Sequence, residues 1–502
     1  MDITKIVSNM QLTPDSSAPL YLQLANNFAS RILESSIPSG TKLPPERELA
    51  RLLGVSRTTT LNAYRLLEER DLITTRRGSG TYVNDLSQSQ SAYTMPWAQL
   101  FTPQYKSPLS SLLRTLVATP TANNIISLAA GMPDPALYPL SLLESALTTK
   151  TPPLDPADMG YIPTEGYFPL RRALATWQTN QGIRTAPDNI LIVSGSQQGL
   201  YLTIKAFVEP RDYVIVESPT YLGAIQILEA AGARTLCLPN TKELDLAVLE
   251  DYLVRYRPKL FYTIPTFQNP TGRVMSLQNR QDLIRLAARH RLVIIEDDPY
   301  GQLYYGQQPP PSLKYLDNYG GVIYLGSFSK ILAPGLRTGW VTAAPSVINH
   351  LAQEKQYIDL HSNNLSQRIL HVCLEDNALS DHLTMVRTEY KKRRNAMVSA
   401  ARRYCSNQLT FTTPEGGFYL WCNVTTPVSA SELLHRTAAA GVSYVPGEAF
   451  YSNQSTSTEI RLCFSTHSED RLVAGMKILG RVLTSCASCP PASTGLAGRP
   501  IL

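Results

Sequence analysis

Runs of apolar residues alternate with helix-spaced segments over most of the chain after residue 123. The runs are N-I-L-I-V-S at 189–194, D-Y-V-I-V-E at 212–217, K-L-F-Y-T-I-P at 259–265, L-V-I-I-E-D at 292–297 and V-I-Y-L-G-S at 322–327. They are nearly continuous, as in strands that are buried on both faces of a mostly parallel sheet. Segments such as Ser276–Arg289 lie between them with helical spacing. The strand–helix order predicts an α/β architecture.

The first part of the chain has a different pattern, in which short helices precede a hairpin from about Leu20 to Val83. Pro45 and the acidic Glu46 suit the start of a helix. Gly54 ends that helix, and Ser56 is a good N-cap for the next one. The stretch T-T-R-R-G-S-G-T-Y-V alternates and turns through two glycines, as a hairpin does. We place this domain at residues 15–84.

Two stretches lack sustained periodicity. Residues 85–123 contain Ser, Gln, Pro and scattered aromatics, which is the composition of a linker. Residues 484–502 are rich in Ser, Ala, Pro and Gly, and we expect a disordered tail there. The large α/β domain then spans residues 124–483.

Composition narrows the class of protein. The sequence is 43% hydrophobic and 17% charged, which is typical of globular domains. A chain of 502 residues is too long for one ordinary core, so at least two domains are expected. No secretory signal or membrane-spanning run is visible, so we expect a cytoplasmic location. Seven cysteines do not make a disulfide framework, and Cys486 and Cys489 form an isolated C-x-x-C, so no metal site is expected. The net charge of +6 permits a nucleic-acid partner without requiring one.

The second predicted helix of the first domain carries polar and basic side chains near its N-terminal end. In a helix-turn-helix these residues enter the major groove, where hydroxyls and guanidinium groups reach phosphates and base edges. The candidates on this helix are Ser56, Arg57, Thr58, Thr59, Asn62 and Arg65. Arg76 and Arg77 would lie at the tip of the hairpin, against the DNA backbone or minor groove. Any single arginine here is more often a solvated surface residue.

The joint pattern over residues 19–83 resembles the winged-helix domain of the GntR family. The resemblance implies that the residues matching the family's DNA contacts also touch DNA here, namely Arg47, Arg57, Thr58, Thr59 and the hairpin residue Gly80. Leu61 stands where many relatives carry a basic residue, so the resemblance does not extend to that contact or to an operator sequence.

The segment S-F-S-K-I-L-A-P-G-L-R-T-G-W at 327–340 follows a predicted strand. Pyridoxal phosphate (PLP) chemistry needs a lysine that binds the cofactor's aldehyde and moves a proton, together with hydroxyls and a cation for the phosphate. Lys330 fits the lysine role, and Ser327, Ser329 and Arg337 fit the phosphate role. Taken alone, Lys330 would more often be an ordinary solvated lysine.

Further candidates follow other predicted strands, at whose ends ligands gather in open α/β sheets. Asp297 is placed to pair with the pyridine nitrogen, and Tyr300 and Asn269 to bond the ring oxygen O3′. Ser196 and Gln197 begin a helix whose amides would bind the phosphate. Tyr221 offers an aromatic face, and Arg461 would bind a carboxylate of the substrate or effector. As alternatives, Asp297 would cap a loop, Asn269 would form a turn, and Arg461 would pair with an internal acid.

The order and spacing of these residues resemble the fold type I aminotransferases of the aminoadipate and kynurenine type, over residues 125–483. The resemblance implies a mostly parallel central sheet with a smaller C-terminal α+β subdomain. It also implies that Tyr161 reaches the phosphate of the neighbouring subunit's cofactor, that Gly131 lies in a loop over the substrate, and that the protein is a homodimer.

A GntR-type winged helix joined to such a domain resembles the MocR regulators. The resemblance implies a PLP-dependent transcription regulator that senses an amino compound or PLP itself, with DNA sites arranged as direct repeats. A working aminotransferase with an accessory DNA-binding domain remains the alternative, because every cofactor position is filled. A plain repressor with an inert dimerisation domain is a third possibility.

Overall fold

The computed structural model describes Leu12 and residues 19–34, 36–76, 79–84, 125–150, 156–239, 243–375, 378–426, 428–453 and 457–487. It divides the chain into two compact units, one up to Gln104 and one from Tyr105 onward. The linker predicted at 85–123 lies outside the described residues.

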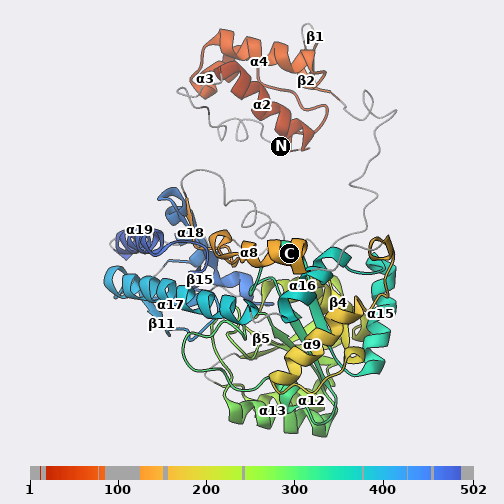
Figure 1. Cartoon of the computed structure of the whole chain (residues 1–502). Helices are drawn as coiled ribbons and strands as arrows, with labels where there is room; N and C mark the ends of the chain where they lie inside the picture. The colour runs from red at the N-terminus through yellow and green to blue at the C-terminus, as the bar shows by residue number, and fades with distance from the viewer. Residues whose placement is uncertain are drawn as a thin grey trace. The chain divides into compact units, whose positions relative to one another are not determined.

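The described part of the first unit contains three helices and a two-stranded hairpin (Figure 1). The elements are α2 (Leu20–Leu33), α3 (Glu46–Leu53), α4 (Arg57–Glu69), β1 (Ile73–Arg76) and β2 (Gly80–Val83). The helices bury Leu24, Phe28, Leu49, Tyr64 and Leu67 in a common core. The predicted order of helices and hairpin is therefore confirmed.

The predicted turn between α3 and α4 is confirmed by its backbone and its cap. Gly54 ends α3 with a φ of 64°, in the left-handed region that glycine adopts without steric cost. The Ser56 hydroxyl then accepts a hydrogen bond of 3.1 Å from the amide of Thr59, which satisfies one free amide at the start of α4.

The second unit is built on a seven-stranded sheet in the order β4-β10-β9-β8-β7-β5-β6. The strands are β4 (Ile190–Val193), β5 (Tyr213–Ser218), β6 (Arg234–Pro239), β7 (Leu260–Thr263), β8 (Val293–Asp298), β9 (Val322–Ser327) and β10 (Gly339–Thr342). Strand β10 runs antiparallel to both of its neighbours, and the other pairings are parallel. The predicted mostly parallel sheet is confirmed.

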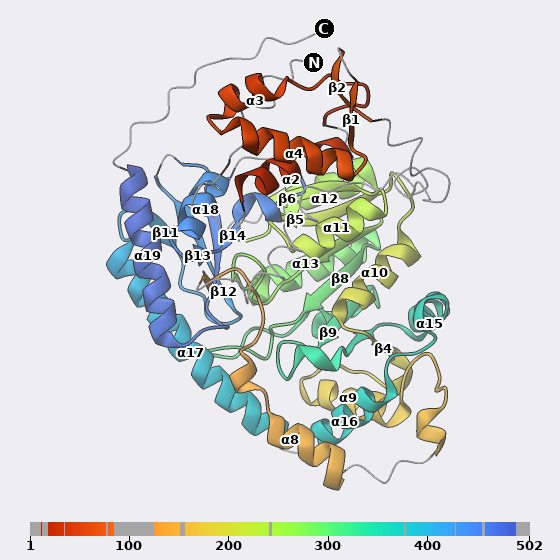
Figure 2. The same ribbon diagram turned by 90° about the horizontal axis from the view of Figure 1, so that it is seen from above.

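Helices cover both faces of this sheet (Figures 1 and 2). One face packs in a core with α10 (Ser196–Phe207), α11 (Leu222–Ala230) and α15 (Pro345–Asp359). The other packs with α12 (Leu246–Tyr256), α13 (Leu277–His290) and α14 (Leu313–Leu316). Burial on both faces explains why the strands are continuous apolar runs. Near β4 lie α9 (Phe168–Asn180) and α16 (Asn364–Glu375), and α8 (Leu140–Ser145) contacts α16.

A smaller α+β subdomain follows, as the aminotransferase resemblance implied. Its sheet has the order β11-β12-β15-β14, with antiparallel neighbours. The strands are β11 (Leu409–Phe411), β12 (Tyr419–Val424), β14 (Val445–Pro446) and β15 (Glu459–Cys463). The helices are α17 (Ala378–Tyr404), α18 (Ala430–Ala439) and α19 (Glu469–Ala487), of which α17 and α19 lie side by side (Figure 1). A short parallel pair joins β3 (Ile126–Ser127) to β13 (Val442–Ser443).

The C-terminal boundary differs from the sequence prediction. Helix α19 continues to Ala487, so the domain does not end at Leu483 and the first four residues of the predicted tail are helical. The physical reason is burial, because Leu483 and Cys486 both lie in the core of this unit. Cys489, the other member of the C-x-x-C, and the rest of the tail lie outside the described residues. Within the described ranges, none of the helices has the length and apolar character needed to cross a bilayer.

Candidate cofactor site and DNA-binding surface

Lys330 lies in the turn after β9, at the end of the central sheet. Its ammonium group donates a hydrogen bond of 2.8 Å to the carbonyl oxygen of Gly131. Gly131 has no room for a side chain, because a Cβ atom would come within 2.0 Å of the Tyr419 hydroxyl. The structure therefore brings the predicted lysine and the predicted loop glycine together.

The surroundings of Lys330 favour its neutral form. Burial lowers the pKa of the lysine to about 8, with Cys463 opposing the shift and the guanidinium groups of Arg461 and Arg337 adding to it. A lysine with a pKa near 8 carries a substantial neutral fraction at physiological pH. The neutral amine is the form that attacks an aldehyde, so the lowered pKa suits the role predicted for Lys330.

Asp297 is buried near the end of β8. Its Oδ2 accepts a hydrogen bond of 2.7 Å from the hydroxyl of Tyr262 on β7, whereas its buried Oδ1 has no hydrogen-bond partner. Burial raises the pKa of this carboxyl to about 7, although the bond from Tyr262 opposes the shift. A buried acceptor without a partner is costly unless a ligand supplies the missing donor.

Tyr300 and Tyr221 line the same region. The Tyr300 hydroxyl lies 2.9 Å from that of Tyr419, and burial raises the pKa of Tyr300 well above its usual value. The Tyr221 hydroxyl donates to the side-chain oxygen of Gln197 at 3.0 Å. Burial raises the pKa of Tyr221, and the charge of Asp297 raises it further, so the tyrosine and the aspartate share one site.

An anion cradle forms where β4 meets α10. Ser196 is the first residue of α10, and Gly195 before it has a φ of 92°. The guanidinium of Arg337 donates a hydrogen bond of 3.0 Å to the carbonyl oxygen of Ser194 and would lie 2.9 Å from a Cβ atom at position 195. Helix amides and a guanidinium converge here, which is the chemistry of a phosphate site.

The two serines beside Lys330 are buried. The hydroxyl of Ser327 accepts a hydrogen bond of 3.1 Å from the amide of Ser329. This bond shapes the turn that presents Lys330, so at least one of the predicted phosphate hydroxyls also holds the local backbone.

Arg461 is a buried cation on β15. Its two terminal nitrogens donate to the side-chain oxygen of Asn269 at 2.9 Å and to the carbonyl oxygen of Ala129 at 2.8 Å. Its guanidinium carbon lies 4.2 Å from the ring centre of Tyr419 and 4.9 Å from that of Phe450, while its buried Nε has no partner. The ion pairs of the described residues do not include Arg461, so the internal-acid alternative finds no support.

These features fit PLP on observations of the structure itself. The free Oδ1 of Asp297 matches the protonated pyridine nitrogen, and Lys330 matches the aldehyde. The cradle at Ser196 and Arg337 matches the phosphate. The three positions therefore present an acceptor, a nucleophile and an anion site to one ligand.

Tyr161 lies apart from this group. Its side chain is 85% exposed, and its ring contacts that of His361 edge-on at 5.8 Å. Sequence reasoning missed Tyr262, Tyr419 and Cys463, which the fold brings next to Asp297, Tyr300 and Lys330. The signal for Tyr262 was a hydroxyl near the end of a mostly apolar run.

The DNA candidates lie mostly on the surface of the winged helix. Arg47, Ser56, Arg57, Thr58, Arg65 and Arg76 are exposed, Thr59, Asn62 and Gly80 are half-buried, and Arg77 lies outside the described residues. The hydroxyls of Ser56 and Thr59 are 2.8 Å apart, so both belong to the cap of α4. Arg57 pairs with Glu46 at 3.6 Å, which ties α4 to α3.

A second cation, Lys42, lies beside the hairpin, or wing, and the sequence did not predict it. The guanidinium of Arg76 lies 5.4 Å from the ring centre of Tyr82, and the ammonium of Lys42 lies 5.8 Å from it. Gly80 is favoured there because its φ of 122° is a backbone conformation that L side chains rarely adopt. The wing thus presents two cations on one aromatic ring.

Comparison with known proteins assigns both units. Residues 20–83 match the family described as "Bacterial regulatory proteins, gntR family". Residues 139–478 match the family described as "Aminotransferase class I and II". The HTH-type transcriptional regulator YisV of Bacillus subtilis strain 168, itself uncharacterized, is 32% identical over 474 residues, which cover 94% of this chain and 97% of YisV. The chain belongs to the MocR type of GntR-family regulators.

Other relatives of this MocR-type regulator match the second unit. The 2-aminoadipate transaminase of Thermus thermophilus is 37% identical over 393 residues, covering 78% of this chain and 98% of the enzyme. The crystal structure of LysN, an α-aminoadipate aminotransferase from the same organism complexed with N-(5'-phosphopyridoxyl)-L-leucine, aligns with a TM-score of 0.71 and 36% identity, over 78% of this chain and 99% of LysN. The fold is that of the PLP-dependent aminotransferases.

Proposed function

We propose that this MocR-type protein is a transcription regulator whose aminotransferase-like unit binds PLP on Lys330 and senses an amino compound or PLP itself. The observation that carries the proposal is the presence in one chain of a capped recognition helix and a site with a half-buried lysine, a buried carboxylate and a buried arginine. Relatives named as regulators that align over both units support it. Such a protein acts on the chromosome, so we place it in the cytoplasm.

The cofactor would supply an aldehyde for amines and an electron sink next to the ligand's α-carbon. Asp297 would accept a hydrogen bond from the protonated ring nitrogen. The phosphate would be held by Ser196, Ser327, Ser329 and Arg337. Tyr300 and Asn269 would bond O3′, Tyr221 would cover the ring, and Gln197 would position Tyr221. Lys330 would move the proton at the α-carbon.

Arg461 would bind the carboxylate of the effector beneath the loop that contains Gly131. It is already oriented by Asn269 and Ala129, and its partnerless Nε adds a donor for an incoming carboxylate. An effector bound at Lys330 and Arg461 can change the affinity for DNA only if it binds one arrangement of the protein more tightly than another, and the two arrangements differ in their affinity for DNA.

The regulator would act as a homodimer, with Tyr161 bonding the phosphate of the neighbouring subunit's cofactor. The high exposure of Tyr161 and the exposed apolar side chains of Tyr357, Ile358 and Leu360 support a contact surface there. Two winged helices would read paired half-sites, which we propose are direct repeats. Arg47, Thr58, Asn62 and Arg65 would contact the major groove, with Arg76, Arg77 and Gly80 on the wing.

An electrophoretic shift of the gene's own promoter fragment tests this proposal. We expect a shifted complex whose affinity changes with PLP or with an added amino acid, and Lys330→Ala to abolish that response without abolishing DNA binding. A promoter fragment that the full chain does not shift would rule out the regulator. A response that survives in Lys330→Ala would rule out sensing through the cofactor.

A working aminotransferase is the second candidate function. It is favoured by the completeness of the site and by the 37% identity to a transaminase over 78% of the chain. Keto-acid production from amino acids separates the two: steady turnover at rates usual for enzymes supports the enzyme, whereas at most one turnover per site supports the sensor.

A further inference from the structure

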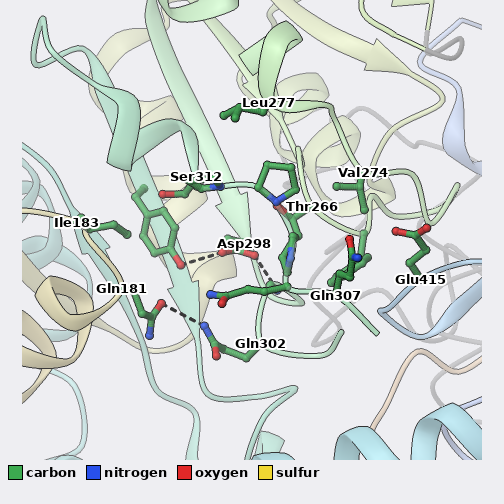
Figure 3. A pocket seen from close by; sticks show the side chains of 17 residues that line it. Gln181, Ile183, Thr266, Val274, Leu277, Asp298, Gln302, Gln307, Ser312 and Glu415 are labelled. Carbon is green, nitrogen blue, oxygen red and sulfur yellow. Dashed lines mark hydrogen bonds between the residues drawn. The ribbon is translucent and has the colours of Figure 1, made fainter. Parts of the chain in front are cut away.

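A second cleft, of about 600 Å³, lies beside Thr266, which follows β7, Asp298 at the end of β8 and Tyr324 of β9. Figure 3 shows the side chains that line it. Its walls include the side chains of Gln181, Asp298, Gln302, Ser312 and Glu415. This volume lies within the usual range for small-molecule sites. Neither Lys330, Asp297 nor Arg461 lines it.

The alternation of β8 separates this cleft from the cofactor site. Neighbouring side chains of a strand point to opposite faces of the sheet. Ile295 packs in the core with α10 and α11, and Asp297 points to that face, where it meets Tyr262. Ile294 packs in the core with α12 and α13, and Asp298 points to this opposite face.

Asp298 is held in place with acceptor capacity left over. Its Oδ1 accepts the amide of Gly301 at 2.8 Å, and its Oδ2 accepts the hydroxyl of Tyr324 at 3.0 Å (Figure 3). A carboxylate has about four lone-pair sites, so each oxygen can accept one more donor. Burial raises the pKa of this carboxyl, and a cation beside it would stabilise its charged form.

The rest of the lining is rich in acceptors. The cleft is lined by a second carboxylate, Glu415, which is exposed, and by four glutamines at positions 181, 302, 307 and 308. Its lining residues in the described part of the chain include no lysine or arginine. The amide of Gln302 donates to the side-chain oxygen of Gln181 at 3.1 Å. Pro309, Pro310 and Pro311 add an apolar wall.

Three arginines lie near these walls, and their hydrogen bonds go to the backbone and to uncharged side chains rather than to the two carboxylates. The charge of Arg280 still acts on Asp298, and that of Arg394 on Glu415. Arg280 is fully buried and donates to the carbonyl oxygens of Met275, Pro265 and Pro311 and to Thr266. Arg387 donates to the backbone and side-chain oxygens of Gln302, and Arg394 to the carbonyl oxygen of Pro414 and to Asn395.

We propose that this cleft is a binding site for a short organic cation, such as a diamine or a larger polyamine. Asp298 would bind one ammonium group and Glu415 the other, while the prolines contact the carbon chain. The amide of Gly301, which Asp298 holds, follows Tyr300 directly, so a ligand at Asp298 contacts the loop that presents a cofactor-site tyrosine. This site goes beyond the proposed function and does not require DNA binding.

Calorimetric titration of the full chain with 1,4-diaminobutane tests the site. Amines react with the cofactor's aldehyde, so the cofactor is first fixed to Lys330 by borohydride reduction. We expect saturable one-to-one binding of the diamine. We expect no binding of 1,4-butanediol, which has a similar length and no charge, or of succinate, which has a similar length and the opposite charge.

Two variants then locate the binding. Glu415→Gln alters an exposed side chain and Asp298→Asn a half-buried one, and each is expected to weaken diamine binding about tenfold or more. Glu432→Gln, at a carboxylate on α18 whose side chain is 52% exposed, is the matched control and should bind normally.

Absence of saturable binding at millimolar diamine would overturn the proposal, as would equal binding of the diol. Unchanged affinity in both Glu415→Gln and Asp298→Asn would also overturn it. Because Glu415 is exposed, loss of binding in Glu415→Gln with an unchanged unfolding temperature supports the site even where Asp298→Asn fails to fold. The titration contains no DNA, so a failure of the protein to shift its promoter fragment, which would overturn the proposed regulator, would not change this result.

Discussion

Burial sets the ionisation of the side chains that would handle the cofactor. It lowers the pKa of Lys330 to about 8 and raises that of Asp297 to about 7, in each case disfavouring the charged form. The lysine is thereby prepared to act as a nucleophile. The aspartate keeps one oxygen free for a donor that would restore its charge.

The first prediction concerns the pH dependence of cofactor uptake. Only neutral Lys330 attacks the aldehyde, so the rate of PLP binding to the cofactor-free protein should rise with pH up to about 8 and then level off. Below that pH it should fall about tenfold per unit. Stopped-flow absorbance measures the rate. A rate that still rises steeply above pH 9 would indicate an unperturbed lysine.

The second prediction concerns the free oxygen of Asp297. Asp297→Asn removes the charge that a protonated ring nitrogen requires, and we expect the Kd for PLP to rise by about 10- to 100-fold. Tyr262→Phe, which removes only a supporting hydrogen bond, should have a smaller effect. Equilibrium dialysis measures both, and equal affinities for the two variants and the natural protein would contradict the assigned role.

At the scale of the element, neighbouring residues at the start of α4 have different roles, one in the stability of the helix and one in the proposed DNA contact. Ser56 caps the helix, whereas the neighbouring Thr58 is exposed and forms no cap. Ser56→Ala should destabilise the winged helix by about 1 kcal/mol, and Thr58→Ala should weaken DNA binding with little loss of stability. Hydrogen exchange of the α4 amides in the full chain measures the loss of stability, and a DNA titration measures the loss of binding, so the two measurements together distinguish the two variants. Equal exchange in both variants would refute the capping role.

The wing should contribute electrostatic affinity. Arg76 is exposed and stacked on Tyr82, so a phosphate contact by its guanidinium would release about one counterion. Arg76→Ala should therefore reduce the slope of log K against log salt by about 1, uniformly across DNA sequences. Fluorescence anisotropy at several salt concentrations measures the slope. An unchanged slope would place Arg76 away from the backbone.

At the scale of the whole molecule, the phosphate cradle is connected to the surface that carries Tyr161. Ser194, whose carbonyl oxygen accepts Arg337, also bonds Asp359 through its hydroxyl at 3.3 Å. Asp359 pairs with the fully buried Lys355 at the end of α15. His361, two residues beyond Asp359, contacts Tyr161. A series of contacts therefore runs from the cradle to the proposed dimer surface.

Mixed dimers test whether Tyr161 acts across that surface. Tyr161→Phe should weaken PLP binding about tenfold, whereas Tyr357→Phe, at a similarly exposed tyrosine, should not. Dimers of a Tyr161→Phe chain with a Lys330→Ala chain should regain one normal site, because each chain supplies what the other lacks. Mixed dimers without a tight site would show that Tyr161 acts within its own subunit or not at all.

The amino-acid sequence by itself determined the local structure. Continuous apolar runs predicted five strands of the sheet, and Gly54 and Ser56 predicted the turn before α4, because backbone conformation and capping depend on neighbouring residues. The motif around Lys330 and the position of Asp297 at a strand end were likewise legible, since ligands gather at such ends.

Only the tertiary structure decided which side chains meet across long separations. Nothing local predicts that Tyr262 bonds Asp297, that Asn269 and Ala129 orient Arg461, or that Lys42 stacks on the wing. Strand alternation alone puts Asp297 and Asp298 on opposite sides of the sheet, but only the packing of the fold decided which side faces the candidate cofactor site and which faces the second cleft. Burial, the largest cause of the shifted pKa values of Lys330 and Asp297, depends on atoms that the fold brings together from distant parts of the chain.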